Sequence, residues 1–482
     1  MAKKDTKGIT VKKEEDFSEW YTQVIQKADL ADYSSVSGCI VYKPNSYMVW
    51  EKIVQETDQR FKAVGIKNAY FPLFIPESLL QKEATHIQGF APEVAWVTHA
   101  GETKLKERLA VRPTSETIMY DSYAKWIRSH NDLPLRINQW NNVVRWEFKH
   151  ATPFLRGREF LWNEGHTCFA TKKEAEAEGP EIIGIYKDIC DNYFALPSLI
   201  GKKSEKEKFA GAEYTVSMEF LMPNGKGIQG PDFHHDGQNF AKAFDISFVN
   251  DKEKKDYVWQ NTWAISTRML GVMISVHSDN KGLVLPPKLA PLQVVIVPIL
   301  FDKTKKEILK EANKIKSSLE KKNIRVHLDD RDNYSPGWKF NEWELKGIPI
   351  RLELGPKDLE KHQVMTVRRD TSEKQSLEIT ALPKEIKLLL EQIQNNLLEN
   401  AQKSLKENIV EVDSLSKAKI QLDDKKILFA PWCNGTECEE DFKDKTGAKT
   451  LNSPFEQPDV KGKKCFNCGK EAKVWFYFGK SY

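Results

Sequence analysis

Two neighbouring stretches of alternating residues could place charged and aromatic side chains on one surface. In the first, 143–148, the two-residue period of a strand puts Arg145 and Glu147 on one face and apolar side chains on the other. In the second, the same period gives one face to Phe160, Trp162, Glu164, His166 and Cys168. A concave sheet surface with an arginine, carboxylates, an imidazole and aromatic rings is typical of a ligand site. For Arg145 and Glu147 alone, an exposed sheet face with a cross-strand ion pair is the alternative.

A basic loop joins these two stretches and suits a polyanion. Its basic residues are Lys149, His150, Arg156 and Arg158. The forked guanidinium of arginine matches phosphate oxygens with two parallel hydrogen bonds. Farther along the chain, Arg268 stands at the start of a helix predicted over 266–276, where the helix N-terminus adds positive potential toward a phosphate. A solvated turn, and an arginine paired with a carboxylate, are the alternatives.

Four of the seven cysteines lie close together near the end of the chain. Two pairs with short internal spacings, Cys433-x4-Cys438 and Cys465-x2-Cys468, fit the two halves of a tetrahedral four-thiolate zinc site. A ligand set made only of cysteine favours a closed, structural metal site. Incidental reduced cysteines are the alternative, and the odd total argues against a disulfide framework.

The whole-chain composition limits the classes of protein to be considered. At roughly 150 residues per domain, 482 residues predict about three domains. A formal net charge of +4 excludes a purely electrostatic nucleic-acid binder, so contacts with nucleic acid would need local patches. No apolar run approaches the ~20 residues of a membrane span, and the basic start lacks an apolar signal region. We therefore expect a cytoplasmic protein without a membrane partner.

The elements that must position these residues fall into two patterns. Helical periodicity over 45–65, a strand over 68–76 and an antiparallel hairpin over 135–170 predict an α+β domain on an antiparallel sheet. After two prolines at 286–287, strands and helices alternate strictly, which predicts a small α/β domain with a mostly parallel sheet. Its predicted elements are strand 292–300, a Lys-rich amphipathic helix, strand 324–328, a helix from 336 and strand 348–354. A helix over 383–408 then leads to the cysteine-bearing tail.

Several blocks of sequence resemble a known family. The blocks at about 45–76, 141–170 and 264–287 resemble motifs 1, 2 and 3 of the class II aminoacyl-tRNA synthetases. A closer resemblance, to the prolyl-tRNA synthetases of the archaeal and eukaryotic type, is carried by RPTSET (112–117), FLRGREFLW (154–162), HHDGQNF (234–240) and GLVLPP (282–287). The resemblance extends from about residue 15 to the end of the chain.

This resemblance implies a domain organisation and a reaction. The implied fold class is α+β, with a class II catalytic domain over 1–287, an α/β anticodon-binding domain over 288–380 and a small zinc-binding α/β domain over 381–482. The implied enzyme is a homodimeric proline–tRNA ligase, which converts L-proline and ATP, with Mg²⁺, to prolyl-adenylate and pyrophosphate and then passes the prolyl group to tRNA(Pro). Structural Zn²⁺ completes the set of cofactors.

The family pattern also assigns roles to individual residues. Arg145 and Arg268 are the implied catalytic residues, because they would stabilise charge at the phosphates during displacement. Proline binding is assigned to Thr114, Glu116, Arg145, Phe160, Trp162, His166 and His234. ATP binding is assigned to Arg145, Glu147, Arg156, Gly157, Gln229, Asp232, Ser266 and Arg268.

Some of these assignments have alternatives. Thr114 and Glu116, taken alone, fit a helix N-cap with a nearby acidic residue. His234 and His235 on an extended segment point to opposite faces, so we do not expect them to bind a metal together. Gly157 and the PDF segment at 231–233 depart from residues common in the family, which leaves the ATP contacts of that edge open.

Three further expectations follow from the resemblance. The interval 170–262 is too short for the inserted editing domain of bacterial relatives, so we expect some alanyl-adenylate formation and no hydrolysis of alanyl-tRNA by this chain. Glu342, Lys346, Arg351 and Arg368 are candidate anticodon contacts, and each fits an ordinary surface charge equally well. In the family a terminal tyrosine can tuck toward the active site, whereas a frayed end is the alternative for Tyr482.

Two other functions remain open from the sequence. One is a synthetase-like protein that has lost catalysis and binds RNA or regulates. The other is a sister synthetase for threonine, serine or histidine. The retained set of Arg145, Glu147, Arg156 and Arg268 speaks against the first, and the second would need a different amino-acid pocket.

Overall fold

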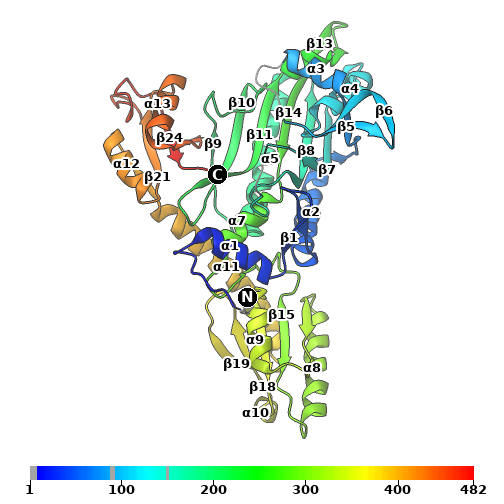
Figure 1. The fold of residues 1–482 in the computed structure, drawn as a ribbon, viewed down its shortest axis with the longest axis vertical. Coiled ribbons are helices and arrows are strands. Elements are labelled where there is room, and N and C mark those ends of the chain that lie inside the picture. The colour runs from blue at the N-terminus through cyan, green and yellow to red at the C-terminus, as the bar shows by residue number, and fades with distance from the viewer. Residues whose placement is uncertain (1–7, 87–92, 148–150) are drawn as a thin grey trace.

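The computed structural model describes residues 8–86, 93–147 and 151–482, and it divides them among three sheet-based regions (Figure 1). Phe148, Lys149 and His150 of the expected basic loop lie outside the described residues. The largest region holds the central sheet, a second lies below it in the view, and the third, which contains β21 and β24, lies beside the upper part of the central sheet.

The central sheet is antiparallel except at one edge, where β3 runs parallel to β7. Within the described residues its spatial order is β23 (Ser453–Pro454), β9 (Leu199–Lys202), β10 (Tyr214–Leu221), β11 (Gly227–Gly237), β14 (Trp259–Ala264), β8 (Glu159–Phe169), β7 (Leu135–Val144) and β3 (Lys67–Asn68). The predicted antiparallel hairpin is the pair β7 and β8. The strand at the other edge, β23, comes from the C-terminal part of the chain.

Helices cover one face of this sheet. Trp263 on β14 packs at 4.7 Å from the ring of Phe61 on α2 and at 6.5 Å from Tyr186 on α5. Gly165 on β8 makes room for that indole, because a β-carbon there would lie 2.1 Å from the ring. The helices of this region are α1 (Phe17–Lys27), α2 (Pro44–Ala63), α3 (Glu77–His86), α4 (Glu116–Trp126), α5 (Lys172–Asn192), α6 (Asn239–Phe244) and α7 (Arg268–His277), with a short 3-10 turn at His130–Asp132. On the opposite face, α4 and α6 pack over part of the sheet through Tyr120, Phe240 and Cys168, and strands β8, β11 and β14 leave room there for a cavity.

Small sheets flank the central one. The strand predicted over 68–76 is wrong as a single element: its start joins the central sheet as β3 and its end joins a separate sheet as β4. The side chain of Gln139, on β7, accepts the N–H of Phe71 in the gap. The flanking strands are β1 (Ala31–Tyr33) with β2 (Ile40–Tyr42), β4 (Phe74–Pro76) with β6 (Thr103–Val111) and β5 (Trp96–Ala100), and β12 (Ser247–Val249) with β13 (Lys255–Tyr257).

The second region contains the predicted alternation of strands and helices. Strands β16 (Val326–Leu328), β15 (Val294–Pro298) and β17 (Ile350–Leu354) are parallel, and β18 (Gln363–Arg368) and β19 (Lys374–Glu378) add an antiparallel hairpin that the sequence did not reveal. The edge strand β19 reads KQSLE, a polar pattern that gives little strand signal. The helices are α8 (Lys305–Glu320), α9 (Pro336–Leu345), α10 (Pro356–Glu360) and the long connecting α11 (Leu382–Glu407).

The third region is built on the strand order β20 (Ile409–Glu411), β21 (Ile427–Trp432), β24 (Val474–Gly479) and β22 (Lys449–Thr450). Its helices are α12 (Leu415–Asp423) and α13 (Thr436–Thr446). Its core includes Trp432, Phe442 and Phe478, together with three of the cysteines. The predicted fold class, an α+β domain on an antiparallel sheet followed by two α/β regions, is confirmed.

A search of the helices in the described segments finds none with the length and apolar character needed to cross a bilayer.

Candidate active site

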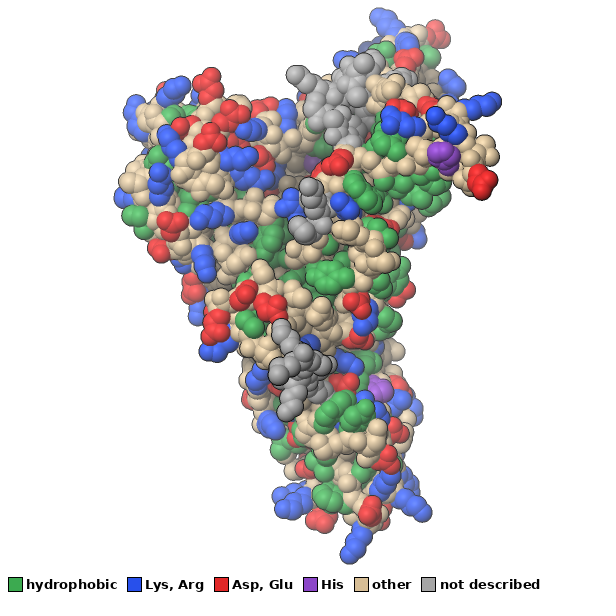
Figure 2. All heavy atoms as spheres, viewed as in Figure 1, with side chains coloured by type: hydrophobic (Ala, Val, Ile, Leu, Met, Phe, Trp, Pro, Cys, Tyr) green, Lys and Arg blue, Asp and Glu red, His purple; other side chains and the backbone are tan. Residues whose placement is uncertain are grey.

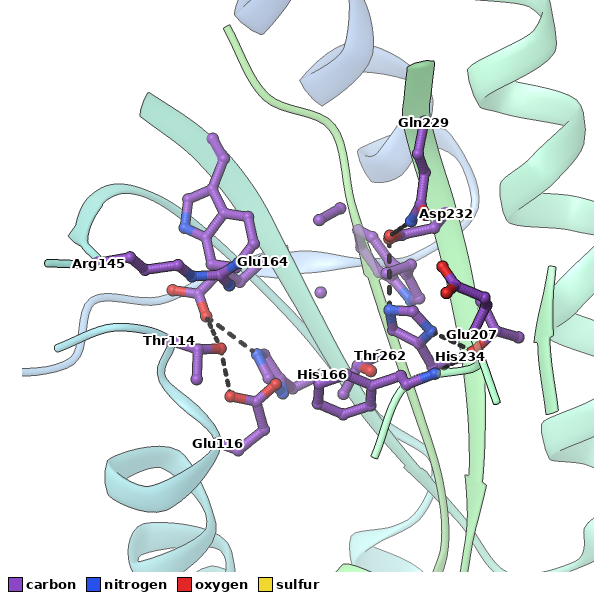
Figure 3. A pocket seen from close by; sticks show the side chains of 16 residues that line it. Thr114, Glu116, Arg145, Glu164, His166, Glu207, Gln229, Asp232, His234 and Thr262 are labelled. Atoms are coloured by element: carbon purple, nitrogen blue, oxygen red, sulfur yellow. Dashed lines mark hydrogen bonds and ion pairs between the residues drawn. The ribbon is translucent and has the colours of Figure 1, made fainter. Parts of the chain in front are cut away.

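A cavity of about 260 Å³ opens on the face of the central sheet opposite α2 and α5 (Figure 3). The strands β8, β11 and β14 form its floor, and the start of α4 closes one side. Its lining residues are Thr114, Glu116, Arg145, Trp162, Glu164, Gly165, His166, Glu207, Phe209, Thr215, Gln229, Asp232, His234, Thr262, Trp263 and Ala264. We call it the amino-acid cavity.

Arg145 enters this cavity from the end of the hairpin. Its guanidinium lies 5.3 Å from the ring centroid of Trp162 and 5.5 Å from that of Phe160, and its Nε donates to the carbonyl of Pro113 at 3.0 Å. These contacts hold an arginine whose remaining N–H groups can meet an anion. Phe160 supports the guanidinium without lining the cavity.

The prediction that Arg145 and Glu147 share a strand face is wrong. Strand β7 ends at Val144, and the N–H of Trp146 donates to the carbonyl of Glu93 rather than to the return strand. The indole of Trp146 packs instead under the guanidinium of Arg158 at 4.2 Å. Glu147 is therefore exposed in a turn, outside the cavity lining.

Thr114 and Glu116 both point into the cavity (Figure 3). The hydroxyl of Thr114 donates to Glu116 and lies 3.2 Å from Glu164, so it does not cap the helix that follows. Ser115 holds the N-cap position of α4 and makes no side-chain cap bond. The N-cap alternative for Thr114 is thus excluded.

Glu164 is the best-satisfied carboxylate of the site. It accepts the backbone N–H of Ser115 at 2.8 Å, the Ser115 hydroxyl at 2.6 Å and the amide of Asn141 at 2.6 Å. Burial alone would raise the pKa of Glu164, but His166 at 3.5 Å and these hydrogen bonds outweigh burial and lower the pKa to about 2. Glu164 and the buried Glu116 therefore place negative potential beside the cavity.

His234 forms the wall across from Glu116 (Figure 3). Its Nδ1 lies 2.8 Å from the hydroxyl of Thr215, and its ring stacks on Phe209 with centroids 4.6 Å apart. Burial lowers the pKa of His234 below 6.5 although Asp232 lies nearby, so the imidazole is neutral near pH 7. His235 points to the other face of β11, as predicted, and pairs with Asn261 at 2.8 Å.

A second cavity of about 170 Å³ adjoins the first, because Gln229 lines both. We call it the phosphate-end cavity. Its lining residues are Leu155, Arg156, Lys203, Glu219, Gly227, Ile228, Gln229, Arg268, Lys449, Leu451, Ser481 and Tyr482. Tyr482 is tied down here rather than frayed: its N–H donates to Gly227, and its hydroxyl accepts from Asn224 at 2.8 Å.

Arg268 is the first residue of α7 and is held by backbone acceptors. It donates to the carbonyl of Gln229 at 3.0 Å and to that of Leu155 at 3.4 Å. Burial, and then the nearby Arg145, lower the pKa of the Arg268 guanidinium below its ordinary value. A phosphate in this cavity would stabilise that charge.

Of three further residues assigned to ATP, one lines a cavity and two do not. Asp232 lines the amino-acid cavity and accepts from the amide of Gln229 at 2.7 Å. Ser266 and Gly157 do not line either cavity: the Ser266 hydroxyl accepts the N–H of Arg268 at 3.3 Å, and a β-carbon on Gly157 would lie 3.3 Å from the carbonyl of Gly38.

The four C-terminal cysteines lie together as a cluster. All four sulfurs lie within 4.8 Å of one another, with Cys438 to Cys465 at 3.7 Å and Cys433 to Cys468 at 3.6 Å. A tetrahedron with metal–sulfur distances of about 2.3 Å has edges of about 3.8 Å, so the cluster fits a zinc ion. The amide of Asn467 donates to Cys438 at 3.4 Å and supports one ligand from outside.

Sequence reasoning missed several residues of the amino-acid cavity. Glu207 and Phe209 lie on a segment of turns with no periodicity, and only the fold brings them to the site. Thr215 and Thr262 look like ordinary strand residues. The short polar-aromatic pattern on β10 and β14 gives no local signal that could have identified them.

Comparison with known families assigns the three regions. The family model for the tRNA synthetase class II core domain (G, H, P, S and T) matches residues 97–277, and the model for the anticodon binding domain matches 293–389. The fold and the paired cavities therefore define a class II aminoacyl-tRNA synthetase. A third model, "Prolyl-tRNA synthetase, C-terminal", matches 415–482.

Curated relatives and solved structures narrow the class further. The chain is 50% identical to the cytoplasmic proline–tRNA ligase of Arabidopsis thaliana over 100% of this chain and 93% of that protein. It is also 50% identical to proline–tRNA ligase 2 of Bacillus thuringiensis subsp. konkukian over the full length of both. Prolyl-tRNA synthetase from Cryptosporidium parvum, complexed with L-proline and AMP, superposes with a TM-score of 0.95 at 46% identity, covering 99% of this chain and 98% of that one. The chain belongs to the prolyl-tRNA synthetase family.

Proposed function

We propose that this chain activates L-proline with ATP in the two adjoining cavities and transfers the prolyl group to tRNA(Pro). Membership of the family makes it an aminoacyl-tRNA ligase. The observation that carries the assignment of the site is the contrast between the cavities. Buried carboxylates lie beside one, whereas the other has the arginines Arg156 and Arg268, and its buried Glu219 is balanced by Lys203 at 2.6 Å. Such a contrast would orient a cationic amine and a polyphosphate on opposite sides of the reacting atoms.

The amino-acid cavity suits a small ring that carries a secondary ammonium. Glu116 and Thr114 offer oxygen acceptors to that ammonium, with the Glu164 carboxylate directly behind them. Trp162 and His234 supply flat surfaces for an apolar ring. Arg145 lies between these groups and the phosphate side, where it could bind both the substrate carboxylate and the α-phosphate.

The phosphate end supplies charge stabilisation for adenylate formation. Joining a carboxylate to ATP brings two anions together, and displacement at the α-phosphorus moves charge onto the leaving pyrophosphate. Arg145, Arg156 and Arg268 would offset that charge. Gln229 and Asp232 carry oxygen atoms of the type that Mg²⁺ prefers, so they could hold ATP-bound Mg²⁺, which would neutralise part of the phosphate charge. Glu147, Gly157 and Ser266 remain predicted ATP contacts.

For tRNA, we propose that the region 288–380 reads the anticodon and that 1–287 and 381–482 are the catalytic and zinc-binding domains. The four candidate contacts are engaged with neighbours in the free chain. Glu342 pairs with Arg331 and Lys346, whereas Arg351 pairs with Glu353 at 2.8 Å and Arg368 with Asp370 at 2.7 Å. To bind a guanine, these side chains would have to exchange their ion-pair partners for atoms of the base, or contact both at once.

A structural zinc ion and a homodimer complete the proposal. The cysteine cluster supports the ion through its spacing. Exposed apolar side chains support the dimer: they lie on α2, on β1, β2 and β4, and between β3 and β4, and they are Tyr33, Val41, Tyr47, Met48, Tyr70 and Phe74. Hydrophobic side chains also gather near the small sheet of β4, β5 and β6 at the upper right of Figure 2. A cytoplasmic location, as in the name of the Arabidopsis relative, belongs to the same proposal.

Charging of tRNA(Pro) with labelled proline tests the function. We expect ATP-dependent formation of prolyl-tRNA, and slow deacylation when the purified chain is given alanyl-tRNA(Pro), because no editing domain is proposed for it. A protein that binds tRNA(Pro) but charges it with no amino acid would favour the RNA-binding alternative. Rapid deacylation of alanyl-tRNA(Pro) would contradict the editing expectation alone.

A further inference from the structure

One wall of the amino-acid cavity is made by residues 203–213, a segment of turns between β9 and β10. It carries Glu207 and Phe209, which both line the cavity, and Glu207 lies across it from Glu116 (Figure 3). The N–H of Phe209 donates to the hydroxyl of Thr215 at 2.9 Å. Backbone hydrogen bonds hold the two ends of the segment, from Lys203 to Thr215 and from Glu213 to His235, so the position of the turns between these ends depends on side-chain contacts. Whatever makes those contacts shapes the substrate cavity.

Phe209 is held by the central sheet, where its ring stacks on His234. The contacts near Glu207 come from the C-terminal module, by which we mean residues 409–482. The hydroxyl of Ser204 is buried and donates to the carboxylate of Glu439 at 2.9 Å. The same carboxylate oxygen accepts the hydroxyl of Thr450. In turn, the Ser204 oxygen accepts the N–H of Glu207 at 3.2 Å. One buried carboxylate of the module therefore fixes the hydroxyl that orients the backbone of Glu207.

Further ties join the same two parts. Lys449 pairs with the carboxylate of Glu207 at 2.7 Å, and Glu440 pairs with Lys206 at 2.8 Å. Strand β23 of the module pairs with β9 directly before the segment. The ion pair to Glu207 is half-buried and reaches a cavity-lining side chain itself, so the module contacts both the backbone and a side chain of this wall.

The position of Glu439 connects this wall to the cysteine cluster. Glu439 follows Cys438 on α13, and Cys438 lies 3.7 Å from Cys465. Holding these sulfurs together fixes the first turn of α13, and with it the Glu439 carboxylate. The hydrogen bond between Glu439 and Ser204 thus connects the cysteine cluster to the wall of the substrate site.

We propose that Glu439 and Ser204 are positioning residues for the amino-acid cavity, through which the C-terminal module holds the wall that carries Glu207 and Phe209. The proposal rests on the proposed function, because it concerns the affinity of that cavity for proline. Neither residue touches the substrate. Their loss should loosen the wall and weaken proline binding, while the groups that act on the phosphates stay in place.

The test compares Glu439→Ala and Ser204→Ala with wild type in proline-dependent ATP–pyrophosphate exchange. We expect each variant to raise KM for proline about fivefold to tenfold, the effect of one lost buried hydrogen bond, and to leave kcat within about twofold. Glu439→Gln keeps an oxygen acceptor for Ser204 and should recover most of the wild-type KM. Lys445→Ala, which removes an exposed ion pair with Asp441 on the same helix, is the matched control and should behave as wild type.

A second readout does not depend on turnover. In hydrogen–deuterium exchange without substrates, peptides that cover 203–213 should exchange faster in both alanine variants and at the wild-type rate in Lys445→Ala. Glu439 is next to Cys438, so Glu439→Ala could also change the zinc content. Ser204 lies outside the C-terminal module, so Ser204→Ala tests the positioning role without that complication. An unchanged KM for proline and unchanged exchange in Ser204→Ala would overturn the inference. A wild-type chain without proline-dependent exchange would instead overturn the proposed function.

Discussion

The cysteine cluster and the amino-acid cavity are built in opposite ways. The cluster takes its four sulfurs from two short stretches of the last part of the chain, each with its own local spacing. The cavity takes its lining from the start of α4, the hairpin of β7 and β8, the turns after β9, and the strands β10, β11 and β14. A local site can be recognised from spacing, whereas a site assembled across the fold depends on every element that brings its pieces together.

The two sites also differ in what a single change should damage. Loss of a cysteine should affect folding of the C-terminal module first. Loss of a cavity residue should affect catalysis or binding while the fold persists. Four predictions test this difference between the two sites, and they are given in order of decreasing expected change in free energy.

The largest effect should follow removal of the metal from the cysteine cluster. Structural zinc sites contribute on the order of 10 kcal/mol to the folding of small domains. We expect one zinc ion per chain by elemental analysis, and loss of ordered structure in residues 409–482 after treatment with a strong chelator or in Cys465→Ser. Proteolysis confined to that region would report the loss. A purified chain that is folded and free of zinc would contradict the metal assignment.

The next largest effect should be that of Arg145→Ala. Removing a charge that stabilises the displacement costs about 3–4 kcal/mol, so exchange should fall by roughly a hundredfold to a thousandfold. Binding of tRNA(Pro), measured by filter retention, should stay close to wild type because the anticodon region is untouched. Arg108→Ala, which removes an exposed ion pair with Glu77, is the control. Exchange near the wild-type rate in Arg145→Ala would end its assigned role.

The ionised Glu164 should contribute on the order of 3 kcal/mol to the free energy of unfolding, in a pH-dependent way. Its pKa in the folded chain is about 2, below the ordinary unfolded value of about 4.3, so the stability that it contributes is present above that unfolded value and lost as the pH falls toward 2. The difference in free energy of unfolding between wild type and Glu164→Gln should be largest at pH 5 and above, and should narrow toward pH 3. A difference that grows on acidification would contradict the assigned ionisation.

Glu116→Gln should have the smallest effect of the four. Losing a charge-assisted hydrogen bond to an ammonium costs about 1.5–3 kcal/mol, so KM for proline should rise by roughly tenfold to a hundredfold while KM for ATP changes little. Asp121→Asn on the exposed side of the same helix is the matched control, since it removes only a surface pair with Lys125. Equal changes in the two KM values would place Glu116 outside the amino-acid subsite.

The sequence revealed those features that have a local pattern. The hairpin of β7 and β8, the helix that begins at Arg268 and the opposite orientation of His234 and His235 all follow from periodicity. The cysteine cluster follows from spacing. The roles of Thr114 and Glu116 came from family resemblance, because their residue types alone fit an N-cap equally well.

Tertiary contacts explain what the sequence could not reveal. The alternating pattern predicted a strand through residue 148, but β7 ends at Val144. The N–H of Trp146 donates to the carbonyl of Glu93 instead of pairing with β8, and Glu147 is exposed. The stretch 68–76 divides between two sheets. Glu207 reaches the cavity on a segment of turns, and its ion pair with Lys449 joins positions more than two hundred residues apart, which no local pattern reveals.

Proline-dependent ATP–pyrophosphate exchange by the purified chain is the decisive experiment for the proposed function, because it needs both cavities and no tRNA. The paired cavities predict exchange with proline, weaker exchange with alanine, and none with threonine, serine or histidine. Exchange with one of those three amino acids but not with proline, or exchange with none, would contradict the assignment of the amino-acid cavity.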